Sequence, residues 1–191
     1  GEPGVEDKIL QSNPLLESLG NAKTLRNDNS SRFGKWMKVG FNVNIAIQGC
    51  EIVNYLLEKS RVVTQTPMER NYHIYFLLAG SDKALRANFK IPPGAGPLDF
   101  AYLNTSGCTK IDNMDDKAEF RDVVGAMETL QFTPEFRLDI LKLIASVLHL
   151  GNVIFDSETG GDNIETATIS RNTQSYADAA AELIGVDTSM L

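Results

Sequence analysis

A short polar stretch near the amino end carries the side chains that could do chemistry. Residues 27–35 read Asn-Asp-Asn-Ser-Ser-Arg-Phe-Gly-Lys, and they lie between a helix-like pattern and a strand-like pattern. Serine hydroxyls and asparagine amides can reach Mg²⁺ or phosphate oxygens, and an arginine can pair with an oxyanion or a carboxylate through two hydrogen bonds. The same residue types also favour turns. The stretch is therefore either a phosphate-and-metal loop or a polar surface loop.

The order of the residues in and around this stretch is more informative about function than its composition. Residues 20–35 read GNAKTLRNDNSSRFGK, which resembles, without a gap, switch I of the myosin motor family in its fuller form GNAKTxxNxNSSRFGK. A match this long is far more specific than a lone glycine-rich pattern. The stretches YLLEKSRV at 55–62 and ERNYHI at 69–74 are also similar to that family. The resemblance is dense from Asp7 to Phe155 and weak beyond.

The resemblance implies a division of roles within the stretch. Ser31 would offer its hydroxyl to Mg²⁺, and Ser30 would lie beside the attacking water and the γ-phosphate as a catalytic residue. Asn27 and Asn29 would help to hold the phosphates of the nucleotide. Arg32 would be the second catalytic residue, bridging to a switch II glutamate and closing the site. The implied cofactor is Mg-ATP in the complete motor domain, where phosphoryl transfer needs placement and charge stabilisation.

Regular elements must position this stretch on both sides. Residues 5–20 predict a helix that is kinked at Pro14 and ends at Gly20. Two strands are predicted at 33–42 and 45–57, with a turn at 42–44.

A capped helix follows these strands. The residues Thr66-Pro67-Met68-Glu69 predict its start, and Gly80 ends it. On that helix His73 is interpreted as a hydrogen-bonding histidine at the edge of the core, not as a metal ligand.

The second half of the chain predicts mainly helices. Asp116–Glu119 forms a predicted capping box that opens one helix, and Thr133-Pro134 starts the next. These two helices predict an antiparallel hairpin on a shared core. Residues 156–163 are polar and glycine-rich and predict a loop, whereas 175–185 predict a short amphipathic helix.

Composition excludes several classes of function. The chain has 191 residues, of which 42% are hydrophobic and 23% charged, as is usual for a globular protein. Its net charge of -7 is opposite in sign to that of a nucleic-acid-binding groove, and no apolar run of about eighteen residues predicts a membrane span. Two cysteines and two histidines are too scattered for a disulfide framework or a zinc site. The cysteine usage fits a cytoplasmic protein, and the resemblance implies association with the cytoskeleton.

Two sequence motifs that a complete motor needs are missing from this sequence. No G-x-x-x-x-G-K-[ST] loop is present, and the stretch nearest to switch II, 122–128, falls inside an amphipathic pattern and is interpreted as core. Arg32 therefore has no visible partner, and the single hydroxyl of Ser31 cannot offset the dehydration of Mg²⁺. We expect this chain alone neither to bind ATP tightly nor to hydrolyse it.

The fold class implied by the resemblance is α/β and mostly helical: a fragment of a P-loop NTPase motor in which two sheet strands precede a helical subdomain. Residues 1–65 would hold the switch I helix, its loop and the central-sheet strands. Residues 66–191 would form the helical upper half of the actin-binding cleft, both parts belonging to one motor domain that is truncated at both ends.

The whole protein would couple Mg-ATP hydrolysis to force on an actin filament, with ATP and ADP as ligands and light chains on a neck outside this chain. Two alternatives stay open. One is a non-catalytic pseudo-motor that tethers actin, and the other is an isolated helical interaction module.

Overall fold

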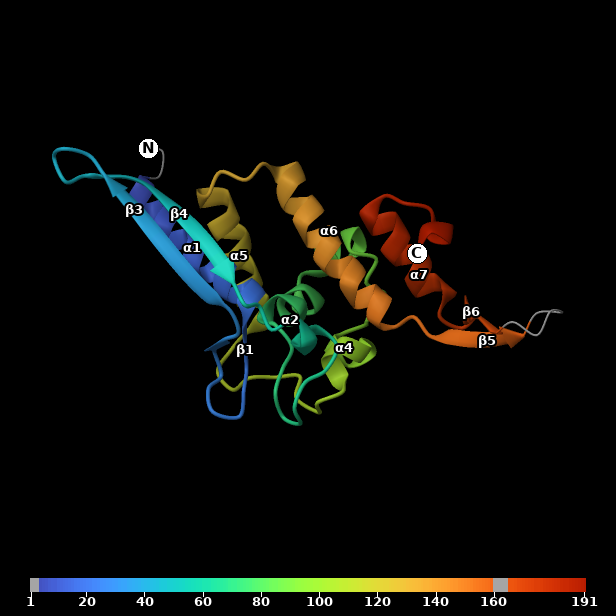
Figure 1. Ribbon diagram of the computed structural model, residues 1–191. Helices are drawn as coiled ribbons and strands as arrows, with labels where there is room; N and C mark the ends of the chain where they lie inside the picture. The colour runs from blue at the N-terminus through green and yellow to red at the C-terminus, as the bar shows by residue number, and fades with distance from the viewer. Residues whose placement is uncertain (1–3, 160–164) are drawn as a thin grey trace.

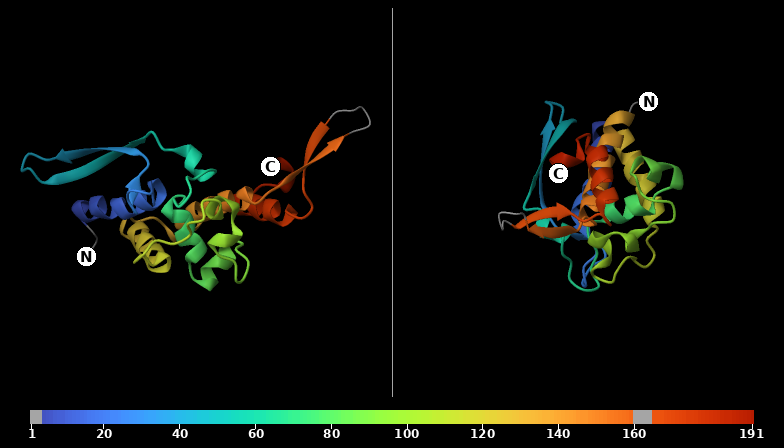
Figure 2. Two further views of the ribbon diagram at one scale, coloured as in Figure 1. Left: turned by 90° about the horizontal axis from the view of Figure 1, so that it is seen from below. Right: turned by 90° about the vertical axis from the view of Figure 1, so that its right-hand side faces the viewer.

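A helical centre with antiparallel strand pairs makes up the fold. The computed structural model describes residues 4–159 and 165–191. Figure 1 and Figure 2 show the β3–β4 and β5–β6 hairpins extending from opposite ends of the helical middle. Each sheet within the described residues has two strands, and β1–β2 is the third pair. The predicted pair of strands is present as β3–β4, and helices follow it as predicted. The prediction was incomplete, because two further strand pairs form.

The elements have the following bounds in chain order. The first part contains α1 (Val5–Gly20), β1 (Asn21–Ala22), β2 (Ser30–Ser31), β3 (Gly34–Phe41), β4 (Ile47–Tyr55) and the 3-10 helix η1 (Lys59–Val62). The middle contains α2 (His73–Gly80), α3 (Lys83–Asn88), η2 (Pro97–Asp99), α4 (Ala101–Asn104) and α5 (Asp116–Thr129). The last part contains α6 (Pro134–Gly151), β5 (Phe155–Thr159), β6 (Glu165–Ile169), α7 (Gln174–Ile184) and η3 (Thr188–Met190).

The core is built around α2, whose residues from His73 to Ala79 are all buried. Phe76 packs in one cluster with Met127 of α5 and Leu148 of α6. Burying a large apolar side chain contributes roughly 1.5–3 kcal/mol, so this short, almost wholly apolar helix is stabilised by its position and not by an amphipathic pattern. The segment that enters α2 is therefore fixed at one end by the core.

A buried arginine strengthens that entry point. Arg70 is fully buried, and its guanidinium lies 3.7 Å from the centroid of the Phe76 ring. The same group donates to Asp116 at 2.9 Å. A charge can be buried in this way because a carboxylate and an aromatic face both compensate for lost hydration. Burial lowers the pKa of Arg70, and Asp116 opposes that change.

The helix predicted to start at Thr66–Glu69 begins later, at His73, so this prediction is wrong. Residues 66–69 form a turn in which the Glu69 N–H donates to the Thr66 carbonyl at 3.0 Å. Met68 has a φ of 67°, which lies in the left-handed region and cannot continue a right-handed helix. The Glu69 carboxylate is not a cap, because Arg61 donates to it at 2.9 Å.

Other helix ends follow the predictions closely. The Thr133 hydroxyl caps α6 by accepting from the Phe136 N–H at 3.2 Å, and α7 ends at Gly185 with a left-handed φ of 76°. Helix α5 begins at Asp116 as predicted, but the predicted capping box is wrong. Its cap is Asp115, whose carboxylate accepts from the backbone N–H two residues later at 3.0 Å.

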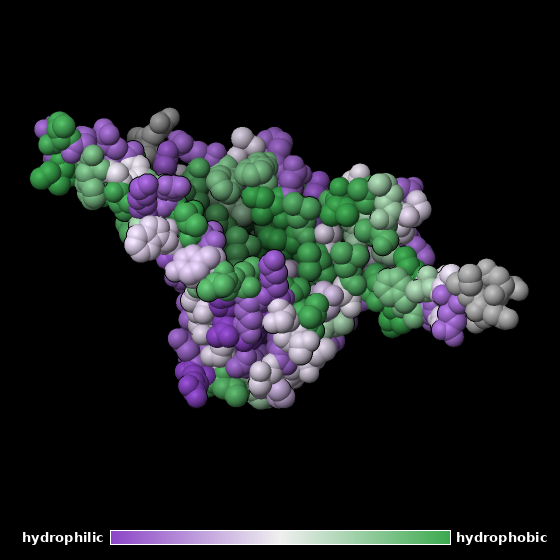
Figure 3. Space-filling view, in the orientation of Figure 1, coloured by the Kyte–Doolittle hydropathy of each residue, from purple (hydrophilic) through white to green (hydrophobic). Residues whose placement is uncertain are grey.

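The predicted antiparallel hairpin of α5 and α6 is not formed. Helix α5 packs against α1 and α2, whereas α6 packs mainly against α7. The buried alanines Ala177, Ala180 and Ala181 give α7 a small-residue face that lets α6 approach closely. Both α5 and α6 do contribute to one shared core, as predicted. Figure 3 shows apolar side chains gathered over this central region.

The polar segment predicted as a loop at 156–163 is partly a strand. β5 pairs with β6 from Phe155 opposite Ile169 to Thr159 opposite Glu165. Residues 160–163 of the prediction lie outside the described residues. The hairpin was not predicted because most of its described side chains are exposed. Its sequence therefore lacks the alternation of apolar and polar residues that marks a half-buried strand.

The β3–β4 hairpin agrees with its prediction and has exposed apolar side chains. Its turn is held by the Asn42 side-chain oxygen, which accepts from the N–H groups of Asn44 and Ala46. Trp36 on β3 lies opposite Val53 on β4, and Trp36 is 66% exposed. In the described parts of the chain, no helix has both the length and the apolar character needed to cross a bilayer.

Candidate functional site

The predicted site residues lie on one compact loop, which we call the switch loop (residues 23–32). It connects β1 to β3 and contains β2, which pairs with β1. The Thr24 N–H donates to the Asn27 carbonyl at 2.8 Å, and the Arg32 N–H donates to the Gly20 carbonyl at 2.8 Å. Backbone pairing therefore sets the path of the loop.

Ser31 keeps the chemistry that a metal ligand needs. Its side chain is exposed, and its hydroxyl donates to the Phe33 carbonyl at 2.9 Å. That bond uses the proton, so the oxygen lone pairs remain for a cation. Ser30 is half-buried beside it, and the exposed Asn27 accepts from the Asn29 N–H at 2.9 Å.

Asn29 is exposed, but both ends of its side-chain amide have protein partners. Its amide nitrogen donates to Glu17 at 3.1 Å, and its oxygen accepts from Asn21 at 3.0 Å. The same oxygen lies 3.1 Å from His73 Nε2. In this arrangement the side chain fixes the loop, and the predicted phosphate contact would require these bonds to be exchanged.

His73 is a neutral core histidine. Only 5% of it is exposed, and burial lowers its pKa to about 4, with the positive charge of Arg70 acting in the same direction and Asp28 opposing it. The neutral ring donates from Nε2 to the Asn29 oxygen. This confirms its interpretation as a hydrogen-bonding histidine at the edge of the core.

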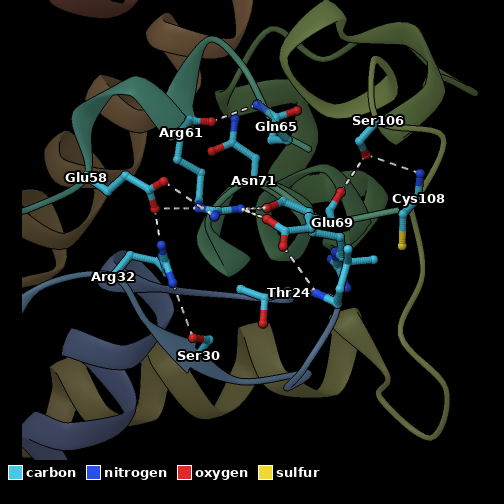
Figure 4. A network of polar contacts seen from close by, with 12 residues as sticks. Thr24, Ser30, Arg32, Glu58, Arg61, Gln65, Glu69, Asn71, Ser106 and Cys108 are labelled. Carbon is cyan, nitrogen blue, oxygen red and sulfur yellow. Dashed lines mark hydrogen bonds and ion pairs between the residues drawn. The ribbon is translucent and has the colours of Figure 1, made fainter. Parts of the chain in front are cut away.

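Arg32 has a partner within this chain, so the expectation that it has none is wrong. Its Nε donates to Glu58 Oε2 at 2.6 Å, and its Nη1 reaches Ser30 Oγ at 3.5 Å (Figure 4). The Glu58 N–H also donates to the Arg32 carbonyl at 3.0 Å. Leu56 has a left-handed φ of 56°, in the bend that carries Glu58 over the loop.

A second arginine extends this ion pair into the interior. Arg61 is only 5% exposed, and its Nε donates to the same Glu58 oxygen at 2.8 Å. Its Nη1 donates to Glu69 Oε2 at 2.9 Å, and Glu69 Oε1 accepts from the Leu25 N–H at 3.2 Å. Figure 4 shows Arg61 between the two carboxylates. The switch loop thus contacts a network of two carboxylates and two arginines.

Electrostatics keeps this network charged. Burial favours the neutral form of Glu58, but hydrogen bonds and positive charge from Arg32 and Arg61 outweigh it and lower the Glu58 pKa. Burial likewise opposes the charge on Arg61, and Glu58 and Glu69 outweigh it and raise the Arg61 pKa. Sequence reasoning missed Glu58, Arg61 and Glu69. The available signal was the spacing of Glu58 and Arg61, an acid and a base three residues apart.

An acidic hollow of about 490 Å³ lies on one side of the loop. Its lining includes the carboxylates of Glu17, Asp28, Asp112, Glu119 and Asp122. Burial, followed by the neighbouring acids, raises the pKa of Glu119, which reflects the concentration of negative charge. Like charges repel, so this hollow disfavours the phosphates of a nucleotide.

The donor set of the switch loop fits a magnesium–triphosphate group. No cluster of three or more His, Cys, Asp or Glu side chains that could hold a metal exists in residues 4–159 and 165–191. The ion would therefore depend on the Ser31 hydroxyl and on phosphate oxygens. Mg²⁺ accepts this kind of coordination, since it usually combines few protein oxygens with phosphates and water.

Comparison with known proteins places these residues in a family. A family model for the myosin head (motor domain) matches residues 2–191. The Myosin ID heavy chain of Dictyostelium discoideum is 44% identical over 186 residues, which cover 97% of this chain and 16% of the relative. Unconventional myosin IC of Drosophila melanogaster is 43% identical over 189 residues, covering 98% of this chain and 17% of the relative.

A mammalian relative agrees with these two. Unconventional myosin-Ic of Rattus norvegicus is 41% identical over 189 residues, which cover 98% of this chain and 17% of the relative. The chain thus spans 16–17% of the length of these three relatives. The family match continues to residue 191, well past Phe155, where the resemblance was expected to weaken.

Proposed function

The chain belongs to the myosin head (motor domain) family, and on that premise we propose that it is the part of an actin-activated ATPase that carries switch I, the loop sensing the γ-phosphate. The observation that carries the proposal is the state of Ser31. Its oxygen is exposed on a loop whose backbone is fixed by β1 pairing, and its hydroxyl proton is already committed to a carbonyl. A metal ligand needs such a positioned oxygen.

In this proposal the side chains of the loop divide the contacts with metal, phosphates and water among them. Ser31 holds Mg²⁺, and Asn27, Asn29, Ser30 and Ser31 orient the phosphates, with Ser30 also placing the attacking water. Mg-ATP, when bound, supplies a triphosphate whose developing charge the metal neutralises. Arg32 closes the site by bridging to a carboxylate outside this chain. Its present ion pair with Glu58 supports this role, because it shows that the guanidinium lies where a carboxylate can reach it.

We propose the wider organisation on the same basis. Residues 1–65 form the switch I helix, loop and sheet strands, and 66–191 form the upper half of the actin-binding cleft. The partners of the whole protein are the actin filament, ATP or ADP, and light chains, at the cytoskeleton. The presence of Ser30, Ser31 and Arg32 favours an active motor over a non-catalytic actin tether.

A metal-swap experiment tests the proposal. In the motor domain that contains this chain, Ser31→Cys replaces a hard oxygen ligand with a soft sulfur, which prefers softer cations than Mg²⁺. We expect ATP turnover with Mg²⁺ to fall by about two orders of magnitude, and Mn²⁺ or Cd²⁺ to restore a large part of it. Ser175→Cys, at an exposed position of α7, is the control and should behave as the wild type.

Two results would contradict the proposal. One is unchanged turnover of Ser31→Cys with Mg²⁺. The other is a loss that no softer cation recovers, which would show that the serine matters for something other than metal contact.

A further inference from the structure

Both ends of the switch loop are attached to one short segment, residues 58–69. At the first end, the Leu25 N–H donates to Glu69 Oε1 at 3.2 Å. At the other end, Arg32 Nε donates to Glu58 Oε2 at 2.6 Å. The two carboxylates carry like charges and repel each other, so a positive group between them can hold them in place.

Arg61 is the group that joins them. It donates through Nε to Glu58 at 2.8 Å and through Nη1 to Glu69 at 2.9 Å (Figure 4). A guanidinium is a planar fork of five N–H donors, so its two bonds have a fixed relative geometry. An ammonium group at the same place keeps the charge but lacks this fork.

The segment that carries Arg61 is itself firmly held. The Arg61 carbonyl accepts from Gln65 Nε2 at 2.7 Å, and Arg61 Nη1 also donates to the Arg70 carbonyl at 3.1 Å. The Tyr72 hydroxyl donates to the Glu58 carbonyl at 2.7 Å. Tyr72 directly precedes the buried helix α2, and Arg70 lies two residues before Tyr72. The ion network therefore connects the switch loop to the buried helix α2.

We propose that Arg61 is a positioning residue for the switch loop: by holding Glu58 and Glu69 together, it presets both ends of the loop in the conformation that accepts nucleotide. The part of this inference that concerns nucleotide rests on the proposed function. The part that concerns loop order does not. If only a fraction of molecules has the loop preset, the apparent nucleotide affinity falls by that fraction.

The test compares Arg61→Lys with a matched control in the motor domain that contains this chain. Arg86→Lys is the control, because the Arg86 guanidinium also bridges two acceptors, the carbonyls of Ser81 and Ala95, and belongs to α3 instead of the network. The first measurement is amide hydrogen exchange over residues 23–32 without nucleotide. The second is the steady-state KM and kcat for Mg-ATP.

Arg61→Lys should raise exchange in the switch loop about tenfold and raise KM about tenfold, with kcat changed by less than about twofold. Arg86→Lys should change none of these quantities. Unchanged loop exchange in Arg61→Lys, or an equal effect of Arg86→Lys, would overturn the proposal, because either result would mean that the arginine only stabilises the fold. If the wild type binds no nucleotide, the proposed function fails, while a loop-specific rise in exchange still supports the positioning role.

A second variant keeps the proposal testable if Arg61→Lys does not fold. Glu58→Gln preserves the shape of the side chain and removes its charge, so it weakens the contacts of residue 58 with Arg32 and Arg61 and leaves the Arg61–Glu69 pair in place. Exchange should rise at the amides of Arg32 and Glu58, which donate to the Gly20 and Arg32 carbonyls, and stay unchanged at Leu25. Unchanged exchange, or equal loosening at Leu25, would contradict the idea that the two ends are held by separate carboxylates.

Discussion

Arg32 and Glu58 form an ion pair at 2.6 Å across 26 residues of sequence. The two side chains are 30% and 33% exposed, so the pair lies at the boundary between solvent and interior. Partly exposed ion pairs contribute little net stability, because hydration and side-chain entropy offset the attraction. Arg32 can therefore exchange one carboxylate for another at small cost, which is what a closing residue must do.

Arg32→Ala should stop hydrolysis while sparing much of ATP binding. Without the bridging guanidinium the site cannot hold the reacting groups in place, so we expect turnover of the motor domain to fall by at least about 10²-fold, with ATP affinity within about tenfold of the wild type. Steady-state turnover and nucleotide titration measure the two quantities. Arg26→Ala, at an exposed arginine of the same loop, is the control. Unchanged turnover in Arg32→Ala would contradict the proposed closing role.

Residues 1–191 expressed alone should not bind Mg-ATP tightly. One neutral hydroxyl, that of Ser31, is too weak a ligand to offset dehydration of Mg²⁺ without further protein oxygens around the phosphates. Calorimetric titration should show no saturation at micromolar ATP, with circular dichroism confirming that the chain is helical. Stoichiometric binding in that range would contradict the expectation.

The lowered pKa of His73 predicts that the stability of the fold depends on pH. The pKa is lowered to about 4 from 6.5, so the unfolded chain binds a proton between these values and the folded chain does not. The contribution of His73 to the free energy of unfolding is thus fully present above pH 6.5. It decreases as the pH falls towards 4, by about 3 kcal/mol in total. Denaturant unfolding at several pH values measures this loss.

His73→Gln is the matched variant for that measurement, since glutamine can still donate to Asn29 and cannot titrate. The difference in unfolding free energy between wild type and variant should change steadily from pH 6.5 to 4. His149, whose pKa is also lowered by burial, is present in both proteins and cancels. Parallel pH profiles would show that His73 is not the titrating group.

Gly20→Ala should destabilise the junction between α1 and the switch loop. A Cβ at Gly20 would lie 2.4 Å from Cδ1 of Phe33, so the ring next to Arg32 would have to move. Overpacking of this kind costs about 1–3 kcal/mol. Gly125→Ala, inside α5 with no atom within 4 Å of its added Cβ, should instead stabilise by about 0.5–1 kcal/mol. Thermal unfolding separates the two, and a shift of the same sign in both would contradict the packing argument.

Much of the fold follows from local signals in the sequence. Thr133, with Pro134 directly after it, marks the start of α6, and Gly185 marks the end of α7, because capping and left-handed φ depend on residues that are adjacent in the chain. The switch loop was also identified from its letters. Its backbone is set by the pairing of β1 with β2, in which Asn21 lies opposite Ser31 and Ala22 opposite Ser30.

The remaining features depend on contacts that no local pattern contains. Glu69 has the spacing of a capping residue, yet it binds Arg61 and Leu25, and the helix begins four residues later, at His73. The partner of Arg32 was missed for the same reason, since the bend at Leu56 brings Glu58 over the loop. In both cases contacts between residues that are distant in the sequence determined the structure more strongly than a local propensity did.

The open edges of the β3–β4 hairpin affect how the purified protein should behave in solution. Among the described residues, its two strands pair with each other and with no third strand, which leaves the outer backbone groups of both edges open. At its tip Val43 and Ile45 are strongly exposed. Figure 3 shows apolar surface at that end of the hairpin. Open edges next to exposed aliphatic groups are templates for strand addition by another copy. Purified on its own, the protein should aggregate through this hairpin as its concentration rises.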